Sequence, residues 1–589
     1  MKIISNIIVT KYNYQEIDKD FDFFLIKKGT LLKKPSARIL DRPVLDGKVL
    51  AIQYTSGNSF IVMLKKNSNN KIVIKEIVTK YNAENDNDLS FEQLHIPFEK
   101  RYEHSLLQIL FNSLASLPPN DGASNIGGKL YYFCKKTNSQ IVCIEFQIKK
   151  NYIFSLNVKT LTKQDNKSDS KSYVLQSNNT LRLKTEKDKD KIGYSISQYK
   201  GEKNEIKFLD TADFEHFNKS KIGILCKIIS KFRKHYSKYA NIDFSVESDW
   251  EHIDVDNAVK NKEKHDKLLK KVFQNKTIRI VDTINDKNSV KLCGILKQQL
   301  SLFLENINIV IKDKVGKNDF NIKIIHDKEY YESLHIEDMY KVCSDKIVQH
   351  ITLEGFNLEN NDKLSPNVIV ILNELLVKYD LIQSHKVSLY DWNFNKEWRF
   401  VLFDKDDFYC MTINYEGFFK IEKLSNDLFN SDEYNEIRVI AEDNKTKNID
   451  EKYRGVVKNN KEEVNIIQET PLFMLPNMER VEDILHKGNI ISRSEKERPE
   501  NFCGCIDIHY FNNKKNNCEY YSSGVIGKGM QSSVSHATHI RKVIPYKNNS
   551  LFFHEILETM NVSFVRNNQL TVIPFPFKYL REYVEIYGK

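Results

Sequence analysis

Residues 307–378 decide the fold prediction, because apolar and polar stretches alternate there with the spacing of strands and helices. The sequence reads INIVI at 307–311, NIKIIHD at 321–327 and IVQHIT at 347–352. It then reads LSPN at 364–367 and VIVILNELLVK at 368–378. The β-branched runs are typical of strands, whereas the last segment repeats its apolar residues at helical spacing. This stretch therefore predicts a small α/β unit.

Two helices are expected within this unit. Ser365 is a suitable N-cap for the last one, and Pro366 suits its first turn, where a missing N–H is tolerated. A more polar helix is expected between the second and third strands, holding Tyr330, Tyr331, Tyr340 and Lys341.

The order of these residues resembles the MID domain of Argonaute proteins, which binds the 5′ end of a guide strand. In that family a Tyr stacks on the first guide base, while Lys and Gln side chains hold the 5′ phosphate. The resemblance implies these roles for Tyr340, Lys341, Gln349 and Lys378. Aromatic rings do stack on unpaired bases, and cations with amide donors do bind terminal phosphates.

The spacing of the aromatic residue and the first lysine departs from the family. Tyr340 and Lys341 are adjacent, whereas the family usually separates them by a helical turn, and neighbours on a helix diverge by about 100°. Tyr331 is therefore an alternative stacking residue, and a guide without a terminal phosphate is another explanation. An unrelated α/β domain with an exposed Lys and Gln is the competing interpretation.

Downstream, the same family has a PIWI domain, an RNase H-like sheet whose carboxylates bind divalent metal. Strand-like runs follow at Val387–Tyr390, Trp398–Phe403, Phe408–Asn414 and Phe418–Glu422. Asp404 and Asp443 are the candidate strand-end carboxylates for Mg²⁺. The close of the chain, from Pro574 to Tyr579, resembles the end of PIWI domains.

The carboxylate set of a nuclease is incomplete in this sequence. Neither a glutamate finger nor a convincing fourth ligand accompanies Asp404 and Asp443. The resemblance therefore implies a protein that binds nucleic acid without cleaving it, and that leaves damage to a partner nuclease or helicase. Mg²⁺ is expected, if at all, at the guide phosphate or at these carboxylates.

The chain as a whole reads as multidomain α+β. We expect a β-rich N-terminal lobe over 1–160, a helical or PAZ-like region over 161–304, a MID-like α/β domain over 305–385, and a PIWI-like RNase H-fold domain over 386–589. The β-rich prediction rests on short apolar runs such as Phe21–Ile26 and Ile72–Val78. The helical prediction rests mainly on 220–239.

Cationic side chains are dispersed along candidate faces. On the 220–239 helix, apolar residues take one side, and the other is expected to carry Lys227, Lys231, Lys234 and Lys238. A second basic stretch, expected as a glycine loop and a helix, holds Gly527, Lys528, Gly529, His536, His539, Arg541 and Lys542. We expect Lys227, Lys231, Lys234, Lys528, Arg541 and Lys542 to contact a nucleic-acid backbone. Ordinary solvated faces are the alternative.

Three other motifs support weaker hypotheses. Cys503, Cys505, His509 and Cys518 lie close together, but a sheet face explains them better than zinc does. Asp432, Asp443 and Lys445 satisfy a minimal nuclease pattern. The stretch GASNIGGK at 122–129 lacks the spacing of a phosphate-binding loop and is expected to be a solvent loop.

Composition limits the class of protein. The 589 residues carry 89 Lys+Arg and 79 Asp+Glu, a net charge of +10, with 41% hydrophobic residues. Disorder and rods are thereby excluded, and a mean hydropathy of −0.50 argues against a membrane protein. Nine scattered Cys indicate reduced thiols in the cytoplasm.

The sequence thus favours a nucleic-acid-guided binding protein of prokaryotic defence against plasmids, viruses and other mobile DNA. Its expected partners are a short guide of DNA or RNA, a complementary target and an effector protein. Two alternatives stay open: a Mg²⁺-dependent nuclease of a restriction or defence system, and a non-enzymatic scaffold or interaction protein.

Overall fold

A computed structural model gives the fold of the chain. It describes residues 3–27, 40–41, 44, 46–55, 59–85, 88–99, 102–118, 122–149, 152–164, 172–196, 206–210, 214–247, 251–252, 258–340, 344–356, 358, 364–389, 392–404, 407–424, 434–475, 509–513, 517–522, 533–534, 539–560, 562 and 571–588.

The chain forms two compact units, each built from separated segments. Unit 1 comprises Met1–Ser248, Leu472–Cys505 and Val525–Thr538. Unit 2 comprises Asp249–Pro471, Ile506–Gly524 and His539–Lys589. Both contain sheets and helices, which confirms a multidomain chain of mixed α and β structure.

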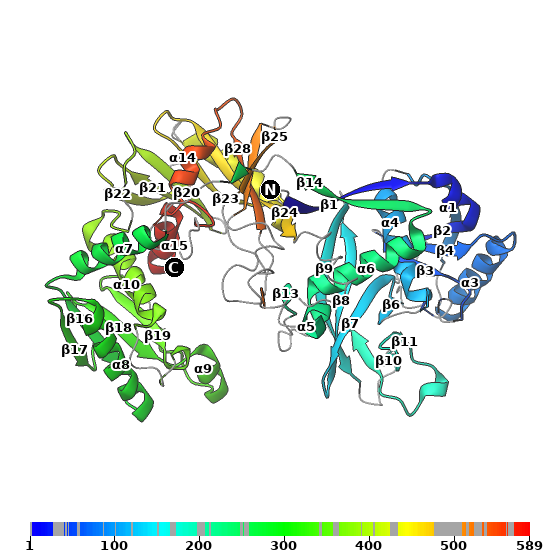
Figure 1. Cartoon of the computed structure of the whole chain (residues 1–589), viewed down its shortest axis with the longest axis horizontal. Helices are drawn as coiled ribbons and strands as arrows, with labels where there is room; N and C mark the ends of the chain where they lie inside the picture. Colours follow the sequence, from blue (N-terminus) through cyan, green and yellow to red (C-terminus); the bar gives the residue numbers. More distant parts are fainter. Residues whose placement is uncertain are drawn as a thin grey trace. The chain divides into compact units, whose positions relative to one another are not determined.

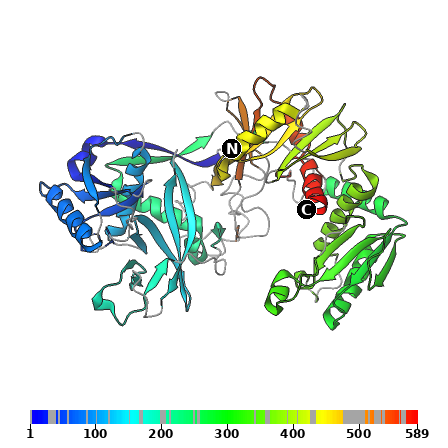
Figure 2. The ribbon, with the colours of Figure 1, turned by 180° about the vertical axis from the view of Figure 1, so that it is seen from behind.

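Unit 1 contains a four-stranded antiparallel sheet with the strand order β3-β4-β2-β5. Its elements are β2 (Phe21–Lys27), β3 (Ala51–Thr55), β4 (Ser59–Lys65), β5 (Ser90–Leu94) and the helix α3 (Asn70–Asn85). Figures 1 and 2 show α3 against this sheet from opposite sides.

Helix α3 corrects the expectation that Ile72–Val78 is a strand. Ile74, Val78 and Tyr81 are buried against the sheet, at steps of four and three residues. That spacing places them on one helical face, so packing outweighs the strand preference of β-branched residues.

The second sheet of unit 1 is a run of long antiparallel hairpins. Its strands are β6 (Ala123–Ile126), β7 (Lys129–Lys136), β8 (Gln140–Lys149), β9 (Ile153–Lys163), β10 (Tyr173–Leu175), β11 (Leu181–Leu183) and β12 (Tyr194–Ile196). The stretch at 122–129, expected as a solvent loop, instead supplies β6 and its turn, and Ser124 and Asn125 are buried.

The other elements of unit 1 complete its packing. They are β1 (Ile3–Tyr12), α1 (Tyr14–Asp20), α4 (Glu103–Asn112), η3 (Ser113–Ser116), η5 (Glu186–Asp188), β13 (Leu209–Asp210), α5 (Phe214–Lys219), α6 (Lys221–Tyr236), β14 (Ala240–Glu247) and β27 (Ser533–Val534). Ser220 caps α6 by accepting a hydrogen bond from the Gly223 N–H, as a helix start there requires.

Unit 2 contains a parallel sheet with the strand order β17-β16-β18-β19. Its elements are α7 (Ala258–Phe273), β16 (Thr277–Asp282), α8 (Lys287–Phe303), β17 (Asn308–Lys312), β18 (Phe320–Ile325), α9 (Lys328–Leu334), β19 (Val348–Thr352), η6 (Leu353–Gly355), α10 (Pro366–Tyr379) and the π-helical turn η7 (Asp380–Ser384). The sequence predicts that a separate α/β domain starts at residue 305. The sheet, however, includes β16, which precedes that residue, as well as β17, β18 and β19, which follow it.

Helix α10 begins where the sequence predicts. The Ser365 hydroxyl accepts a hydrogen bond from the Asn367 N–H at 3.2 Å, and Pro366 is in the first turn. Its buried face packs with α8 and the sheet, and Figure 1 shows the helix beside the sheet, so the α/β prediction for 307–378 is confirmed. Tyr340, however, lies after the end of α9, not on a helix.

The second sheet of unit 2 is antiparallel and includes β22-β21-β20-β23-β24. Its elements and their companions are β15 (Glu251–His252), β20 (Trp398–Asp404), β21 (Asp407–Ile413), β22 (Phe419–Leu424), α11 (Asn435–Thr446), η10 (Ile449–Glu451), β23 (Tyr453–Lys458), β24 (Val464–Leu475), β25 (His509–Asn513), β26 (Cys518–Ser522), β28 (His539–Pro545), α14 (Phe553–Glu558) and α15 (Pro576–Tyr587). Three of the four strand runs expected after residue 386 are confirmed, but Val387–Tyr390 contains no described strand.

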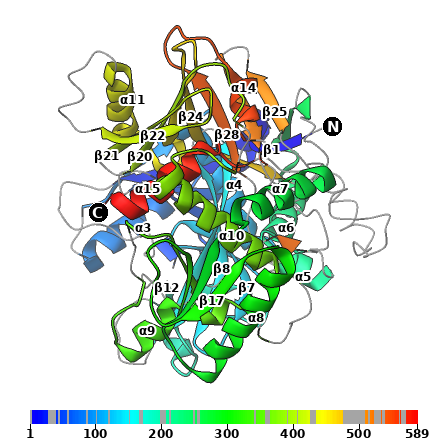
Figure 3. The same ribbon diagram turned by 90° about the vertical axis from the view of Figure 1, so that its left-hand side faces the viewer.

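Helix α15 joins the two sheets of unit 2. Phe577, Tyr579 and Leu580 are fully buried in a core shared with α10 and β20. The Tyr579 hydroxyl donates to the Asp380 carboxylate at 2.6 Å. Figure 3 shows α15 beside α10. Among the described helices, none is long and apolar enough to cross a bilayer.

Candidate functional site

A small pocket lies in unit 2 where β19, α10 and α15 meet. Its volume is about 10 Å³, and it is lined by Tyr340, Val348, His350, Lys378, Glu582, Glu585 and Ile586. We call this the end pocket. Three separate parts of the sequence supply its polar groups, so it exists only in the folded chain.

Lys378 lies at the base of the end pocket, in the last turn of α10. Its side chain is 12% exposed. The ammonium donates to the Val348 carbonyl at 2.9 Å and to Gln349 Oε1 at 2.8 Å, and it lies 3.3 Å from Glu582 Oε1. A cation at a helix C-terminus is also stabilised by the helix dipole.

Gln349 is brought to Lys378 by the edge strand β19. Its Oε1 accepts from the lysine, and its Nε2 donates to the His350 carbonyl at 3.1 Å. One N–H of the amide has no hydrogen-bond partner among the described residues. The sequence-based pairing of Gln349 with Lys378 thus corresponds to a direct contact.

Tyr340 and His350 form the aromatic part of the pocket. Their ring centroids are 4.7 Å apart with the planes inclined by 52°. Tyr340 is 41% exposed, and its hydroxyl hydrogen-bonds the Glu585 carboxylate. Burial, together with Glu585, raises the pKa of Tyr340.

His350 is held neutral in this environment. Burial lowers its pKa to about 4, and the charges of Lys323 and Lys378 act in the same direction. Its Nε2 is enclosed and has no hydrogen-bond partner in the described part of the chain. The protein groups that line the pocket therefore include an uncharged ring nitrogen.

Two carboxylates of α15 complete the end pocket. Glu582 is buried beside Lys378, and burial raises the pKa of Glu582 although Lys378 opposes the shift. Glu585 is exposed and contacts Tyr340. Neither acid was expected from the sequence, because α15 lies far from α10 along the chain.

The other residues predicted for this site lie elsewhere or are not described. Tyr331 is buried and its hydroxyl accepts from the His326 N–H at 3.1 Å, so its ring is not available for stacking. Lys341 lies outside the described residues. Among the described candidates, Tyr340 and Lys378 line the end pocket, and Gln349 contacts Lys378.

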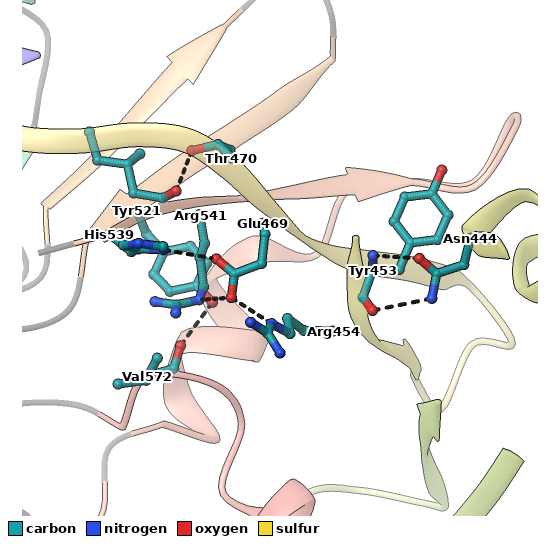
Figure 4. Close-up of polar contacts among 10 residues, drawn as sticks. Asn444, Tyr453, Arg454, Glu469, Thr470, Tyr521, His539, Arg541 and Val572 are labelled. Carbon is teal, nitrogen blue, oxygen red and sulfur yellow. Dashed lines mark hydrogen bonds and ion pairs between the residues drawn. The ribbon is translucent and has the colours of Figure 1, made fainter. Parts of the chain in front are cut away.

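A second group of charged side chains surrounds Glu469 on β24 (Figure 4). Arg454 Nε lies 2.6 Å and Arg541 Nε 3.1 Å from Glu469 Oε1, and His539 Nδ1 lies 3.3 Å from Oε2. We call Arg454, Glu469, His539 and Arg541, with Arg581, the basic cluster.

Electrostatics make the basic cluster positive overall. Burial favours the neutral form of Glu469, but His539, Arg541 and Arg454 outweigh it and lower its pKa to about 2. One carboxylate is thus paired with two guanidinium groups and an imidazole. Arg581 makes no ion pair with any described residue, and partial burial, together with the charges of Arg454 and Arg541, lowers its pKa.

The lysines predicted on α6 do not share one exposed face. Lys227 and Lys234 are exposed, whereas Lys231 is 8% exposed and packs with the apolar face. The expected stripe of four cations is therefore interrupted at Lys231, whose long stem is buried with the apolar residues. Lys238 lies beyond the end of α6 and pairs with Glu16 and Asp20.

The basic stretch near residue 540 is a strand, not a helix. His539 and Arg541 lie on β28 and both point to Glu469, while Lys542 is half-buried on the same strand. Alternation along a strand explains why positions 539 and 541 share a face. Gly527, Lys528, Gly529 and His536 lie outside the described residues.

The two carboxylates predicted to bind metal lie on different kinds of element. Asp404 does end β20, but Asp443 lies within helix α11. The Asp443 carboxylate accepts from the Tyr453 hydroxyl at 2.5 Å and pairs with Lys447 at 3.1 Å, which holds its pKa low. Within the described ranges, no three His, Cys, Asp or Glu side chains are placed to hold a metal ion.

The zinc hypothesis and the minimal nuclease pattern both include residues that the structure does not describe. Cys503, Cys505 and Asp432 are not described. Cys518 is buried on β26, which pairs with β25 as the sheet interpretation expected. Lys445 pairs with Glu442 at 2.9 Å on the surface of α11.

Sequence reasoning missed Arg454, Glu469 and Arg581 as well as both pocket carboxylates. The alternation of RGVVK at 454–458 and of IIQET at 466–470 places Arg454 and Glu469 on strands, but sequence alone does not reveal which strands are neighbours. The sequence signal that points to Arg581 and Glu582 is a pair of adjacent charges on an amphipathic helix.

Comparison with known proteins finds similarity to solved structures. No family model matches the chain, and no curated protein matches it. A solved structure of Clostridium butyricum Argonaute, bound to a guide DNA and a 19-mer target DNA, is similar with a TM-score of 0.49 and 10% identity, over 99% of this chain and 97% of that chain.

Proposed function

We propose that this chain binds a short nucleic-acid strand by its end, in the end pocket of unit 2. The observation that supports this proposal is that an aromatic ring, Tyr340, and a cation, Lys378, line one pocket, and that the amide of Gln349 contacts the same lysine. This combination suits a terminal nucleotide, which presents both a flat base and polar groups.

The exposed face of Tyr340 is the stacking surface in this proposal. An aromatic ring accepts any base, because every base has a π-face, so the pocket would recognise an end and not a sequence. The ring of Tyr340 also contacts His350, which helps to keep it in place.

The basic cluster would contact the strand's backbone. Arg581 precedes Glu582 on α15, so one helix contributes to both the cluster and the end pocket. Arginines bind phosphate oxygens through paired N–H groups, and an excess of positive charge over Glu469 favours an anionic ligand.

As in the family that residues 307–378 resemble, the bound strand would act as a guide that pairs with a complementary target. We propose a role in defence against mobile DNA, in which a partner nuclease or helicase damages the target. The Asp443 carboxylate is already bound by the Tyr453 hydroxyl and by Lys447, and this supports a binding protein over a Mg²⁺-dependent nuclease.

Binding of fluorescent 20-nucleotide strands tests the proposal. A linear strand should bind more tightly than a circular strand of the same composition, and Tyr340→Ala should weaken linear binding by about tenfold. Tyr415→Ala, an exposed tyrosine of the same unit, is the matched control. Equal binding of linear and circular strands would refute end recognition, and metal-dependent cutting abolished by EDTA and by Asp443→Ala would favour the nuclease.

A further inference from the structure

We infer that the end pocket accepts a strand terminus with a free hydroxyl and discriminates against a terminal phosphate. This inference rests on the proposed function and specifies its ligand. The juxtaposition behind it is Lys378 beside Glu582, with Glu585 on the same side of α15.

The lysine that would hold a phosphate is already coordinated. An ammonium has three N–H donors, and three acceptors lie within 3.3 Å of Lys378 Nζ: the Val348 carbonyl, Gln349 Oε1 and Glu582 Oε1. A phosphate could reach this cation only by displacing Glu582, and the displaced carboxylate would stay beside it.

The charge around the pocket also disfavours a dianion. Among the described residues that line the pocket, Glu582 and Glu585 each bring a carboxylate, and Lys378 brings the one cation. Lys323, whose charge also acts on His350, donates to the Met339 carbonyl at 2.9 Å. Like charges placed together at a binding site are a strong source of discrimination.

The groups left for a ligand match a hydroxyl. A carboxylate of the pocket, such as that of Glu585, can accept the hydroxyl's O–H. The neutral His350 Nε2 adds one more uncharged contact. A phosphate has only acceptor oxygens when ionised, and so it cannot satisfy the two carboxylates.

The test compares one 20-nucleotide strand in four forms: hydroxyls at both ends, a 5′ phosphate, a 3′ phosphate, and a circle. Fluorescence anisotropy at fixed salt would measure each dissociation constant. We expect the form with two hydroxyls to bind at least about tenfold more tightly than one phosphorylated form, and the phosphate that weakens binding identifies the end in the pocket.

A double substitution, Glu582→Gln with Glu585→Gln, keeps the shape and removes both charges. It should abolish the discrimination, whereas Glu329→Gln, an exposed acid on α9 of the same unit, should leave it unchanged. Thermal unfolding of each variant confirms that the fold is kept.

The outcomes separate the two proposals. Linear strands that bind better than the circle, with phosphate tolerated or preferred, would overturn the hydroxyl inference and leave end binding intact. A circle that binds as well as every linear form would overturn both. Discrimination that persists in the double variant would also overturn the assignment to Glu582 and Glu585.

Discussion

The ammonium of Lys378 on α10 lies 3.3 Å from the Glu582 carboxylate on α15, with both side chains almost fully buried. This ion pair joins the helix beside the parallel sheet to the helix that ends the chain. It stabilises the fold and, in our proposal, also sets the chemistry of the end pocket.

Removing only one partner of this pair should be costly. Lys378→Met leaves Glu582 buried without its counter-charge, and we expect the free energy of unfolding to fall by about 3–5 kcal/mol. Adding Glu582→Gln to Lys378→Met should restore much of that loss. Chemical denaturation of the single and double variants measures the coupling, and additive effects would contradict a direct interaction.

Asp380 should make stability fall as pH rises. Burial raises the pKa of this carboxyl to about 6, above its ordinary value, although Ser388, Tyr579 and Ser384 donate to it. The folded chain therefore binds a proton that the unfolded chain has released, so stability is greatest below about pH 4 and is lost as pH rises through 6.

The size of that effect is about 3 kcal/mol for a shift of about two units. Asp380→Asn cannot ionise, so its stability relative to the parent should improve between pH 4 and 7. Denaturation across this range provides the measurement. A difference that stays constant with pH would show that Asp380 remains ionised throughout.

His350 should have the opposite pH dependence. Burial lowers its pKa from 6.5 to about 4, so the unfolded chain binds a proton between these values that the folded chain does not. Stability from this group is present above pH 6.5 and is lost as pH falls towards 4. His350→Gln should therefore lose less stability than the parent on acidification.

The two titrations overlap and partly cancel in the parent protein. The variants separate them. In Asp380→Asn the free energy of unfolding should change with pH only through His350, and in His350→Gln only through Asp380. Parallel pH profiles for all three proteins would contradict both assignments.

The basic cluster should act through charge. Arg581→Ala should weaken single-strand binding and lower the slope of log affinity against log salt by about 0.7 in magnitude, the value for one phosphate contact. Glu469→Gln, which removes the central carboxylate, should tighten binding at low salt. If Arg581→Ala left the salt dependence unchanged, the nucleic-acid backbone would not contact the basic cluster at Arg581. Lys420→Ala, which removes an exposed lysine on β22, is the control.

Local patterns in the sequence determined several elements of this protein. Ser365 and Pro366 start α10 because they satisfy a helix's first N–H groups whatever the surroundings. The strands β17 and β18 follow from β-branched runs, and the family resemblance places Gln349 and Lys378 in one site, where they are in contact.

Tertiary structure decided what the local patterns left open. Residues 72–78 form a helix because Ile74 and Val78 pack on a sheet, and Asp443 lies on a helix because Ile437 and Ile440 are buried beneath it. Glu582 faces Lys378, and Arg454 faces Glu469, only because distant segments are neighbours in the fold. Backbone propensity and capping act within a few residues, whereas the charge of a pocket depends on which helix and which strand are adjacent.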